Sequence, residues 1–196
     1  MIKRLFDITS SILGLILFSP FFVVISLVIL LSSKGGIFYR QIRVGKNQEE
    51  FELLKFRSMK QGSDKAGQIT VGNNDSRITG IGKVLRKLKL DEIPQLINVI
   101  KGDMSIVGPR PEVPKYVNLY TKAQLKVLTV RPGLTDLASI EYINENEILG
   151  NSENPEEEYV NEIMPKKLTL NLQYIESQSF FGDVGLIFKT FGKILR

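Results

Sequence analysis

Two adjacent carboxylates, Asp91 and Glu92, follow a lysine- and arginine-rich stretch and stand just before a proline. Asp is favoured at a helix N-cap and Glu in a first helical turn, so the pair could simply begin a helix. The pair could also carry chemistry, because an aspartate can attack phosphorus to form an acyl phosphate and adjacent carboxylates suit Mg²⁺. Spacing alone leaves both interpretations open.

The composition narrows the chemistry that this chain can perform. Its 196 residues include no histidine and no cysteine, which excludes Ser–His triads, Cys–His pairs and zinc bound by imidazole or thiolate. The formal net charge is +5, so anionic lipids or phosphorylated small molecules are expected partners. Nucleic acid is not expected as a partner, because the basic regions lack interleaved aromatic residues.

Two short helices are predicted to position the carboxylate pair. Apolar residues recur at helical spacing over residues 81–88 and again over 93–100, and Gly102 suits the end of the second helix. Asp91 then lies at the joint, at or next to the N-cap of the second helix. Beyond it, "GDMSIVGPRP" is predicted to be a stiff loop that carries Arg110 between two prolines. Upstream, two runs of β-forming residues around "GKNQEE" predict a β-hairpin.

Residues 1–34 are predicted to be a membrane segment. Residues 8–31 carry no charge, and a helix of that length can cross a hydrocarbon core of about 30 Å. Pro20 would bend such a helix, and the Ser19 hydroxyl could satisfy the freed backbone. Cations flank both ends, which favours keeping both ends in the cytoplasm. A re-entrant helix that turns at Ser19-Pro20 and returns through one leaflet fits these features, with an ordinary kinked span as the alternative.

Residues 35–196 are predicted to form one cytoplasmic, membrane-associated domain. The expected fold is α+β, mostly helical, with a small β-hairpin or sheet. A helix is expected around residues 115–128, and the acidic stretch 141–165 is interpreted as solvated surface. The C-terminal segment suits either an amphipathic helix in the membrane interface or a helix packed on the core. Its apolar stripe is formed by Val184, Ile187, Phe188, Phe191, Ile194 and Leu195.

The order of several motifs resembles the bacterial sugar transferase family, the small monotopic phosphoglycosyl transferases that begin membrane-linked glycan assembly. "KRLFDI" starts the membrane segment, "SP" bends it and "KFRSM" closes the hairpin. "SRITGIGKVLRKLKLDEIPQLINVIKGDMSIVGPRP" forms the long central signature, and "VRPGLT" follows it. The resemblance covers nearly the whole chain, and the central block is far more specific than any short motif.

The resemblance implies a reaction and its residues. Family members move a sugar 1-phosphate from a UDP-sugar to polyprenol phosphate, use Mg²⁺ and follow a ping-pong route. Asp91 matches the family's nucleophile, which would expel UMP and hold a phosphosugar ester. Glu92 matches its neighbour, assigned to metal binding and charge control, so Asp91 and Glu92 together are the predicted catalytic and metal site. The protein would lie on the cytoplasmic face of the bacterial inner membrane, in contact with membrane lipid.

Cations in the matching motifs are expected to bind the substrate phosphates. The predicted set is Lys55, Arg57, Arg77, Arg86, Arg110 and Arg131. Four of them are assigned to the donor diphosphate or the acceptor phosphate: Lys55 and Arg57 in "KFRSM", Arg110 in "PRP" and Arg131 in "RPG". For Arg77 and Arg86, solvated surface charge is the alternative. Arg4 and Asp7 match the motif that starts the membrane segment and are expected to be interface anchors.

One stretch departs from the family pattern. After "RPG", many members continue with Thr-Gly and then Ala-Gln-Val-Asn-Gly, whereas this chain has "LTDLASIEY", which places Asp136, Ser139 and Glu141 there. The choice of sugar is therefore open. A non-enzymatic, basic, membrane-anchored binding protein and a metal-dependent phosphatase remain alternatives. A homodimer is compatible with the sequence.

Overall fold

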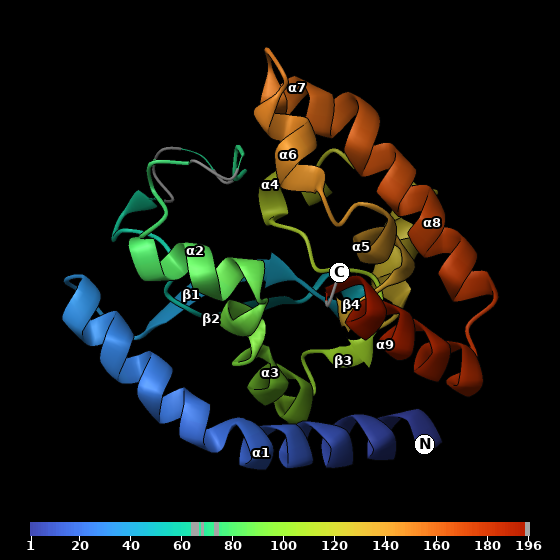
Figure 1. The fold of residues 1–196 in the computed structure, drawn as a ribbon. Coiled ribbons are helices and arrows are strands. Elements are labelled where there is room, and N and C mark those ends of the chain that lie inside the picture. The colour runs from blue at the N-terminus through green and yellow to red at the C-terminus, as the bar shows by residue number, and fades with distance from the viewer. Residues whose placement is uncertain (64–66, 68, 73–74, 195–196) are drawn as a thin grey trace.

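The computed structural model describes residues 1–63, 67, 69–72 and 75–194; Leu195 and parts of the polar loop 60–77 lie outside them. Helices dominate, and two small sheets complete an α+β fold, as expected (Figure 1). The helices are α1 (Ile2–Ser32), α2 (Gly80–Lys87), α3 (Gln95–Lys101), α4 (Pro114–Val117), α5 (Leu137–Glu141), α6 (Glu145–Gly150), α7 (Pro155–Glu158), α8 (Met164–Glu176) and α9 (Phe180–Ile194). The strands are β1 (Phe38–Val44), β2 (Glu50–Phe56), β3 (Ser105–Val107) and β4 (Gly133–Thr135).

The longest element, α1, is one continuous helix with Pro20 inside it. Ser19 Oγ donates to the carbonyl oxygen of Ile16 at 2.8 Å, the carbonyl that Pro20 leaves without its helical partner. This confirms the role predicted for Ser19. Figure 1 shows the helix bending, with its concave side toward the rest of the molecule. The helix therefore bends at Ser19-Pro20 but stays continuous, because its backbone hydrogen bonding continues past the proline, and the predicted re-entrant path through one leaflet stays a prediction.

Polar contacts fasten the first part of α1 to the domain. Asp7 is buried and accepts hydrogen bonds from Ser105 Oγ at 2.8 Å and from the backbone N–H of Ile106 at 3.1 Å. Arg4 donates to two carbonyl oxygens at the end of α3, at 2.6 and 2.9 Å. The prediction of an interface anchor is therefore wrong for Asp7, since its burial removes it from any membrane interface.

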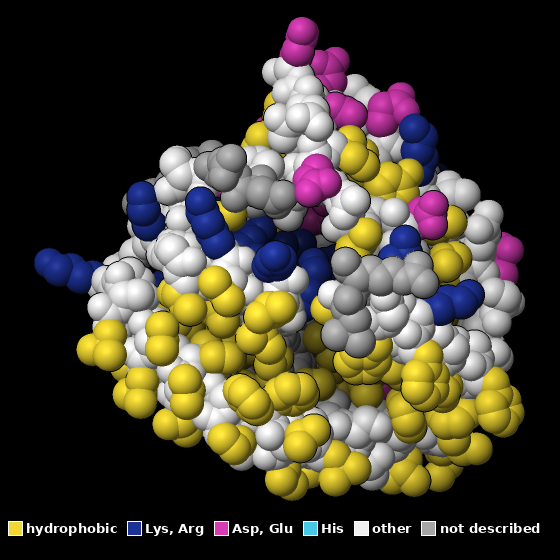
Figure 2. Space-filling model, in the orientation of Figure 1, with side chains coloured by type: hydrophobic (Ala, Val, Ile, Leu, Met, Phe, Trp, Pro, Cys, Tyr) yellow, Lys and Arg dark blue, Asp and Glu magenta, His cyan; other side chains and the backbone are white. Residues whose placement is uncertain are grey.

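Most apolar side chains of α1 are exposed, unlike those of a core helix. By length and composition, α1 could cross a membrane. Exposed apolar residues on α2, directly after α2 and on α9 add to this surface: Val84, Leu88, Phe181, Phe188 and Phe191. In Figure 2, apolar side chains cover the lower face of the molecule, over α1, and lysine and arginine side chains gather in a hollow above it.

Local sequence signals explain the elements around Asp91. Strands β1 and β2 pair as the antiparallel hairpin predicted around "GKNQEE". Thr79 caps α2, because its side chain accepts from the backbone N–H of Gly82 at 3.0 Å. Helix α3 ends at Gly102, whose φ of 103° is the left-handed conformation expected at a helix end. Both helices predicted beside Asp91 are confirmed.

Strands β3 and β4 form a parallel pair that brings two distant loops together. Ser105 lies opposite Gly133, and a Cβ added to Gly133 would lie 2.2 Å from the backbone nitrogen of Gly108. Glycine is therefore required for this close approach of two backbones. The pair sets the "GPRP" loop beside the start of α5, where Asp136 is the N-cap.

The largest apolar core packs α4 and α8 against the end of β1. The helix predicted over residues 115–128 is instead two pieces, because α4 ends at Val117 and a 3₁₀ segment covers Gln124–Thr129. Thr121 and Gln124 exchange side-chain-to-backbone hydrogen bonds of 2.8 and 3.3 Å. Such a capping box starts a new helical segment, which explains the break.

Candidate active site

Asp91 lies in a 3₁₀ turn, Leu90–Glu92, between α2 and α3. Lys89 before it has a φ of 56°, a left-handed conformation that turns the chain sharply between the two helices. Pro94 occupies the N-cap position of α3, and neither this turn nor α3 has a side-chain cap. The interpretation of Asp91 as a helix cap is therefore wrong.

The Asp91 carboxylate is buried, and no residue in the described part of the chain pairs with it directly. The residue is 5% exposed, and none of the described residues gives its side chain a hydrogen bond or ion pair. Burial raises the pKa of Asp91 above its ordinary value of 3.8, and the nearby charge of Lys55 opposes this rise. A buried carboxylate that no neighbour holds is available to react with a ligand.

Glu92 has the opposite surroundings. Its Oε1 accepts from Lys55 Nζ at 2.9 Å, and Arg110 donates to both of its carboxylate oxygens. Burial alone would raise the pKa of Glu92, but Arg110 and Lys55 outweigh it and hold that pKa well below the ordinary value of 4.5. Adjacent carboxylates whose pKa values are pushed in opposite directions are suited to different roles.

Lys55 and Arg110 reach the carboxylate pair from distant parts of the chain. Lys55 lies on β2, and burial lowers its pKa while Glu92 opposes the change. Arg110 lies in the "GPRP" loop, and Glu92 raises its pKa. The backbone N–H of Arg110 donates to Asp136 Oδ2 at 3.1 Å, which ties this loop to the start of α5.

A cavity of about 160 Å³ lies beside Asp91, and we call it the Asp91 cavity. Its lining is Lys55, Arg86, Lys89, Asp91, Glu92, Arg110, Ser139, Tyr142, Ile143, Glu145, Asn146 and Lys167. Five of these residues are cations and three are carboxylates, so the cavity favours anions. Cations held around a carboxylate can stabilise the charge on a phosphoryl group that the carboxylate attacks.

Two further predicted cations differ in their surroundings. Arg86 lines the Asp91 cavity and donates to Thr70 Oγ1 at 2.8 Å. Arg57 is buried and donates to the carbonyl oxygens of Ser33, at 2.8 Å, and Lys34. Its guanidinium thus closes the C-terminal end of α1, and its assignment to a substrate phosphate stays a prediction.

Arg77 and Arg131 lie outside the Asp91 cavity lining. Arg77 forms an ion pair with Asp75 at 2.6 Å and donates to the carbonyl oxygen of Gly67 at 2.6 Å. This pairing lowers the pKa of Asp75 to about 2. Arg131 is exposed and donates to the carbonyl oxygen of Gly102 at 2.8 Å. Both cations have structural partners, and their binding roles also stay predictions.

Sequence reasoning missed the part of the cavity wall that α6 and α8 contribute. Lys167 on α8 pairs with Glu145 at 2.5 Å, and both line the Asp91 cavity. Glu145 lies in the acidic stretch that was interpreted as solvated surface, which is wrong for this residue. Ser139 and Tyr142 line the same cavity, so part of the stretch that departs from the family pattern does face Asp91. Only tertiary packing brings these residues there, and no local motif marks them.

The metal site predicted at Asp91 and Glu92 fits Mg²⁺ in part. Mg²⁺ is commonly held by one or two carboxylates together with substrate phosphates and water. The unpaired Asp91 carboxylate suits that role, whereas Glu92 already accepts from Lys55 and Arg110. Within the described ranges, no group of three or more carboxylates gathers as a ready-made metal site.

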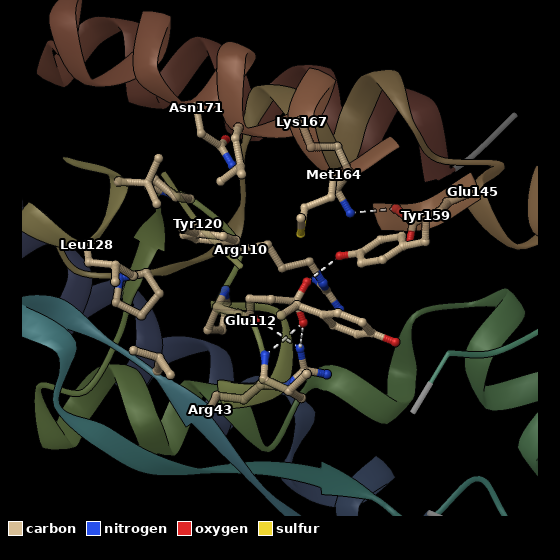
Figure 3. Close-up of a pocket in the computed structure, with 18 of the residues that line it drawn as sticks. Arg43, Arg110, Glu112, Tyr120, Leu128, Glu145, Tyr159, Met164, Lys167 and Asn171 are labelled. Atoms are coloured by element: carbon tan, nitrogen blue, oxygen red, sulfur yellow. Dashed lines mark hydrogen bonds and ion pairs between the residues drawn. The ribbon is translucent and has the colours of Figure 1, made fainter. Parts of the chain in front are cut away.

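Figure 3 shows a second cavity, of about 180 Å³, whose lining overlaps that of the first. We call it the tyrosine cavity, after Tyr116, Tyr120 and Tyr159 in its lining. The two cavities share a border of six residues: Lys55, Arg86, Arg110, Glu145, Asn146 and Lys167. Asp91 and Glu92 line only the first of the two cavities, so this largely cationic border separates the Asp91 carboxylate from the tyrosine cavity.

Comparison with known proteins identifies relatives over the whole chain. The family model described as bacterial sugar transferase matches residues 1–196. The exopolysaccharide production protein ExoY of Rhizobium meliloti is 36% identical over 205 residues, which cover 97% of this chain and 84% of the relative.

Two longer relatives carry names that state a reaction. The UDP-N-acetylgalactosamine-undecaprenyl-phosphate N-acetylgalactosaminephosphotransferase of Aeromonas hydrophila is 36% identical over 99% of this chain and 44% of its own length. The UDP-glucose:undecaprenyl-phosphate glucose-1-phosphate transferase of Klebsiella pneumoniae is 38% identical over 96% of this chain and 39% of its own length. This chain therefore spans less than half of either protein, and the two names specify different sugars.

Proposed function

Because this chain belongs to the bacterial sugar transferase family, we propose that it transfers a sugar 1-phosphate from a UDP-sugar to polyprenol phosphate. The products are polyprenol diphosphate-sugar and UMP. This transfer would be the first membrane step of glycan assembly. The observation that carries the proposal is the buried, unpaired Asp91 carboxylate in a cavity walled by cations. That arrangement suits attack on a phosphorus atom whose oxygens are held by positive charge.

In the first half-reaction, an Asp91 carboxylate oxygen attacks the sugar-linked phosphorus of the donor. The bond from this phosphorus to the bridging oxygen breaks, and UMP leaves with that oxygen and its electron pair. The sugar phosphate stays on Asp91 as an acyl phosphate. Attack requires the ionised carboxylate, and none of the described cations pairs with it directly, which leaves its oxygens free to react.

In the second half-reaction, an oxygen of polyprenol phosphate attacks the same phosphorus. The bond from phosphorus to the Asp91 oxygen breaks, which regenerates the carboxylate and releases polyprenol diphosphate-sugar. Both half-reactions transfer a phosphoryl group between oxygen atoms, so no oxidant or reductant is needed. The acceptor and the departing UMP use the site in turn, as a ping-pong route requires.

Glu92 supports both steps by holding Lys55 and Arg110 at the cavity. Its carboxylate accepts from both cations, so their N–H groups stay oriented without folding back on Asp91. Two positioned cations can stabilise the charge on the non-bridging phosphate oxygens. Arg86 and Lys167 extend the same cationic wall.

Mg²⁺ belongs to the proposal as a metal held by Asp91 together with the donor diphosphate, with Glu92 nearby. When bound, it would supply positive charge to the phosphate oxygens. The residues of this chain would bind the diphosphate, orient the phosphorus toward Asp91 and shield the acyl phosphate from water.

The proposal places α1 in one leaflet, entering and returning on the cytoplasmic face. Its support is the exposed apolar surface of α1, the bend at Pro20 and the neighbouring apolar residues of α2 and α9 (Figure 2). The cationic hollow lies beside this apolar face, where the phosphate of a lipid acceptor would be found. Undecaprenyl phosphate, named in two relatives, is the acceptor to test first.

The test measures UMP release by the detergent-purified chain with Mg²⁺ and a panel of UDP-sugars, with and without undecaprenyl phosphate. Intact mass is recorded in parallel. We expect UMP turnover only with the lipid, and a sugar-phosphate adduct without it. Asp91→Asn should lose both, while Asp103→Asn, which keeps an acceptor for Asn98 and lies outside the Asp91 cavity, should keep both.

Each alternative predicts a distinct result. A fully active Asp91→Asn protein would refute the assignment of Asp91 as the nucleophile. Release of free phosphate or sugar phosphate without lipid would favour a phosphatase. No UMP from any donor would favour a membrane-anchored binding protein.

A further inference from the structure

Asn171 on α8 has a buried side-chain amide. It is 5% exposed, and its Oδ1 accepts no hydrogen bond from the residues that the structure describes. Figure 3 shows Asn171 extending from α8 into the tyrosine cavity. A buried polar group left unpaired is costly, and it is commonly a group that a ligand satisfies.

Tyr120 lines the same cavity with an aromatic ring and a hydroxyl that receives no hydrogen bond from any described residue. The charges of this cavity are, by contrast, already engaged: Glu112 pairs with Arg43 at 3.1 Å and accepts from the hydroxyl of Tyr159. A flat ring and an unpaired amide oxygen in the lining of one cavity favour a planar, uncharged group that carries its own donor and acceptor.

The direction of the proposed reaction decides which part of the donor can reach this space. In phosphoryl transfer, the attacking and leaving oxygens lie roughly in line through phosphorus. With Asp91 on one side of the shared cationic border, the leaving UMP must extend to the other side. The tyrosine cavity lies there, because it shares that border but not Asp91.

We propose, on the basis of the proposed transferase function, that the tyrosine cavity binds the pyrimidine nucleoside of the donor. The Asn171 amide oxygen accepts from the ring N–H of uracil, and the amide NH₂ donates to the adjacent ring carbonyl. Tyr120 supplies a ring against which the base packs. The sugar remains in the Asp91 cavity, near Ser139 and Tyr142.

The experiment compares UMP binding by the detergent-purified protein, Asn171→Leu and Asn161→Leu, using calorimetry. Leucine has nearly the shape of asparagine but cannot pair with the base, so UMP affinity should fall about 10- to 100-fold in Asn171→Leu. Asn161 is exposed and lies outside both cavities, so Asn161→Leu should bind UMP like the unmodified protein. Glucose 1-phosphate, which lacks the nucleoside, should bind all three proteins equally.

Thermal unfolding distinguishes a binding role from a structural one. Replacing an unpaired buried amide by an apolar group should leave the melting temperature of Asn171→Leu unchanged or higher. Weaker UMP binding with intact stability supports the inference, and Asn171→Ala should repeat the loss if leucine prevents folding. Unchanged UMP binding, a loss for glucose 1-phosphate instead, or no UMP binding by the unmodified protein would overturn it. The two proposals can also fail separately. If the unmodified protein binds UMP and Asn171→Leu binds it more weakly, but no UDP-sugar is turned over, the transferase function is refuted and the nucleoside site at Asn171 is retained.

Discussion

The ion-pair network around Glu92 gives a prediction about stability. Replacing Glu92 by glutamine keeps the shape of the side chain but removes the charge that faces Lys55 and Arg110. The two cations would then lie close together in a poorly solvated place without their nearest counter-charge. We therefore expect Glu92→Gln to fold but to unfold at a clearly lower temperature.

The expected size follows from the burial of the three side chains. Removing one partner from a buried ion pair costs about 3–5 kcal/mol. Water reaches part of this network, since the Lys55 and Arg110 side chains are 19% and 32% exposed, so we take the lower end, about 3 kcal/mol. In a chain of 196 residues each kcal/mol shifts the melting temperature by about 2–4 °C, which gives a fall of about 6–12 °C.

Circular dichroism melts in one detergent at neutral pH would measure this change. Glu162→Gln is the matched control, because Glu162 pairs with Lys166 on the surface and its side chain is 62% exposed. Solvent screens that pair, so its melting temperature should not change measurably. If Glu92→Gln melts at the same temperature as Glu162→Gln, the network does not stabilise the site and the reasoning is refuted.

The pH dependence gives the same prediction a second check. The pKa of Glu92 is held well below 4.5 in the folded protein, so its contribution is fully present above about pH 4.5. It is lost as the pH falls through the lowered pKa of the folded state. The difference in melting temperature between the unmodified protein and Glu92→Gln should therefore be constant near neutral pH and shrink in strong acid.

Two further predictions concern the nucleophile and the close packing of β3 and β4. UMP formation should fall in acid as Asp91 is protonated. Burial and then the Glu92 charge raise the pKa of Asp91, so this fall should move to lower pH in Glu92→Gln. We would measure pH–rate profiles of both proteins, and a fall at the same pH in both would contradict this account. Gly133→Ala should lower the melting temperature, because the new Cβ would meet the backbone of Gly108 at 2.2 Å. Gly185→Ala is the control and should not lower it, because a Cβ there would meet nothing within 4 Å. Equal melting temperatures for the two variants would contradict this account.

Local patterns predicted the parts of the fold that local interactions determine. The hairpin around "GKNQEE", the helices on both sides of Asp91 and the stop at Gly102 follow from turn residues and apolar spacing. Asp91 and Glu92 could also be recognised as a candidate site, because both lie inside one continuous motif, and their chemistry stays a prediction. The break within residues 115–128 was missed because the Thr121–Gln124 capping box competes with an otherwise helical pattern.

Long-range partners were not predictable from the sequence, and they decide what a charged residue does. Arg57 and Lys55 are two positions apart in "KFRSM", yet Arg57 binds carbonyl oxygens at the end of α1 while Lys55 binds Glu92. Lys167 and Glu145 lie far from any motif and still line the Asp91 cavity. Their positions depend on how α6 and α8 pack, which no spacing rule in the sequence expresses.

The attachment of α1 at both ends has a consequence for how the protein selects its membrane topology. A straight helix of 31 residues would be about 46 Å long, more than enough to cross a hydrocarbon core of about 30 Å. Arg4 and Asp7 hold one end to the domain, and Arg57 holds the other end to the same domain. Both attachments cannot persist if one end lies across the bilayer. If α1 lies in a membrane as proposed, folding of the domain would oppose the spanning orientation, and topology would be a result of tertiary structure as well as of flanking charge.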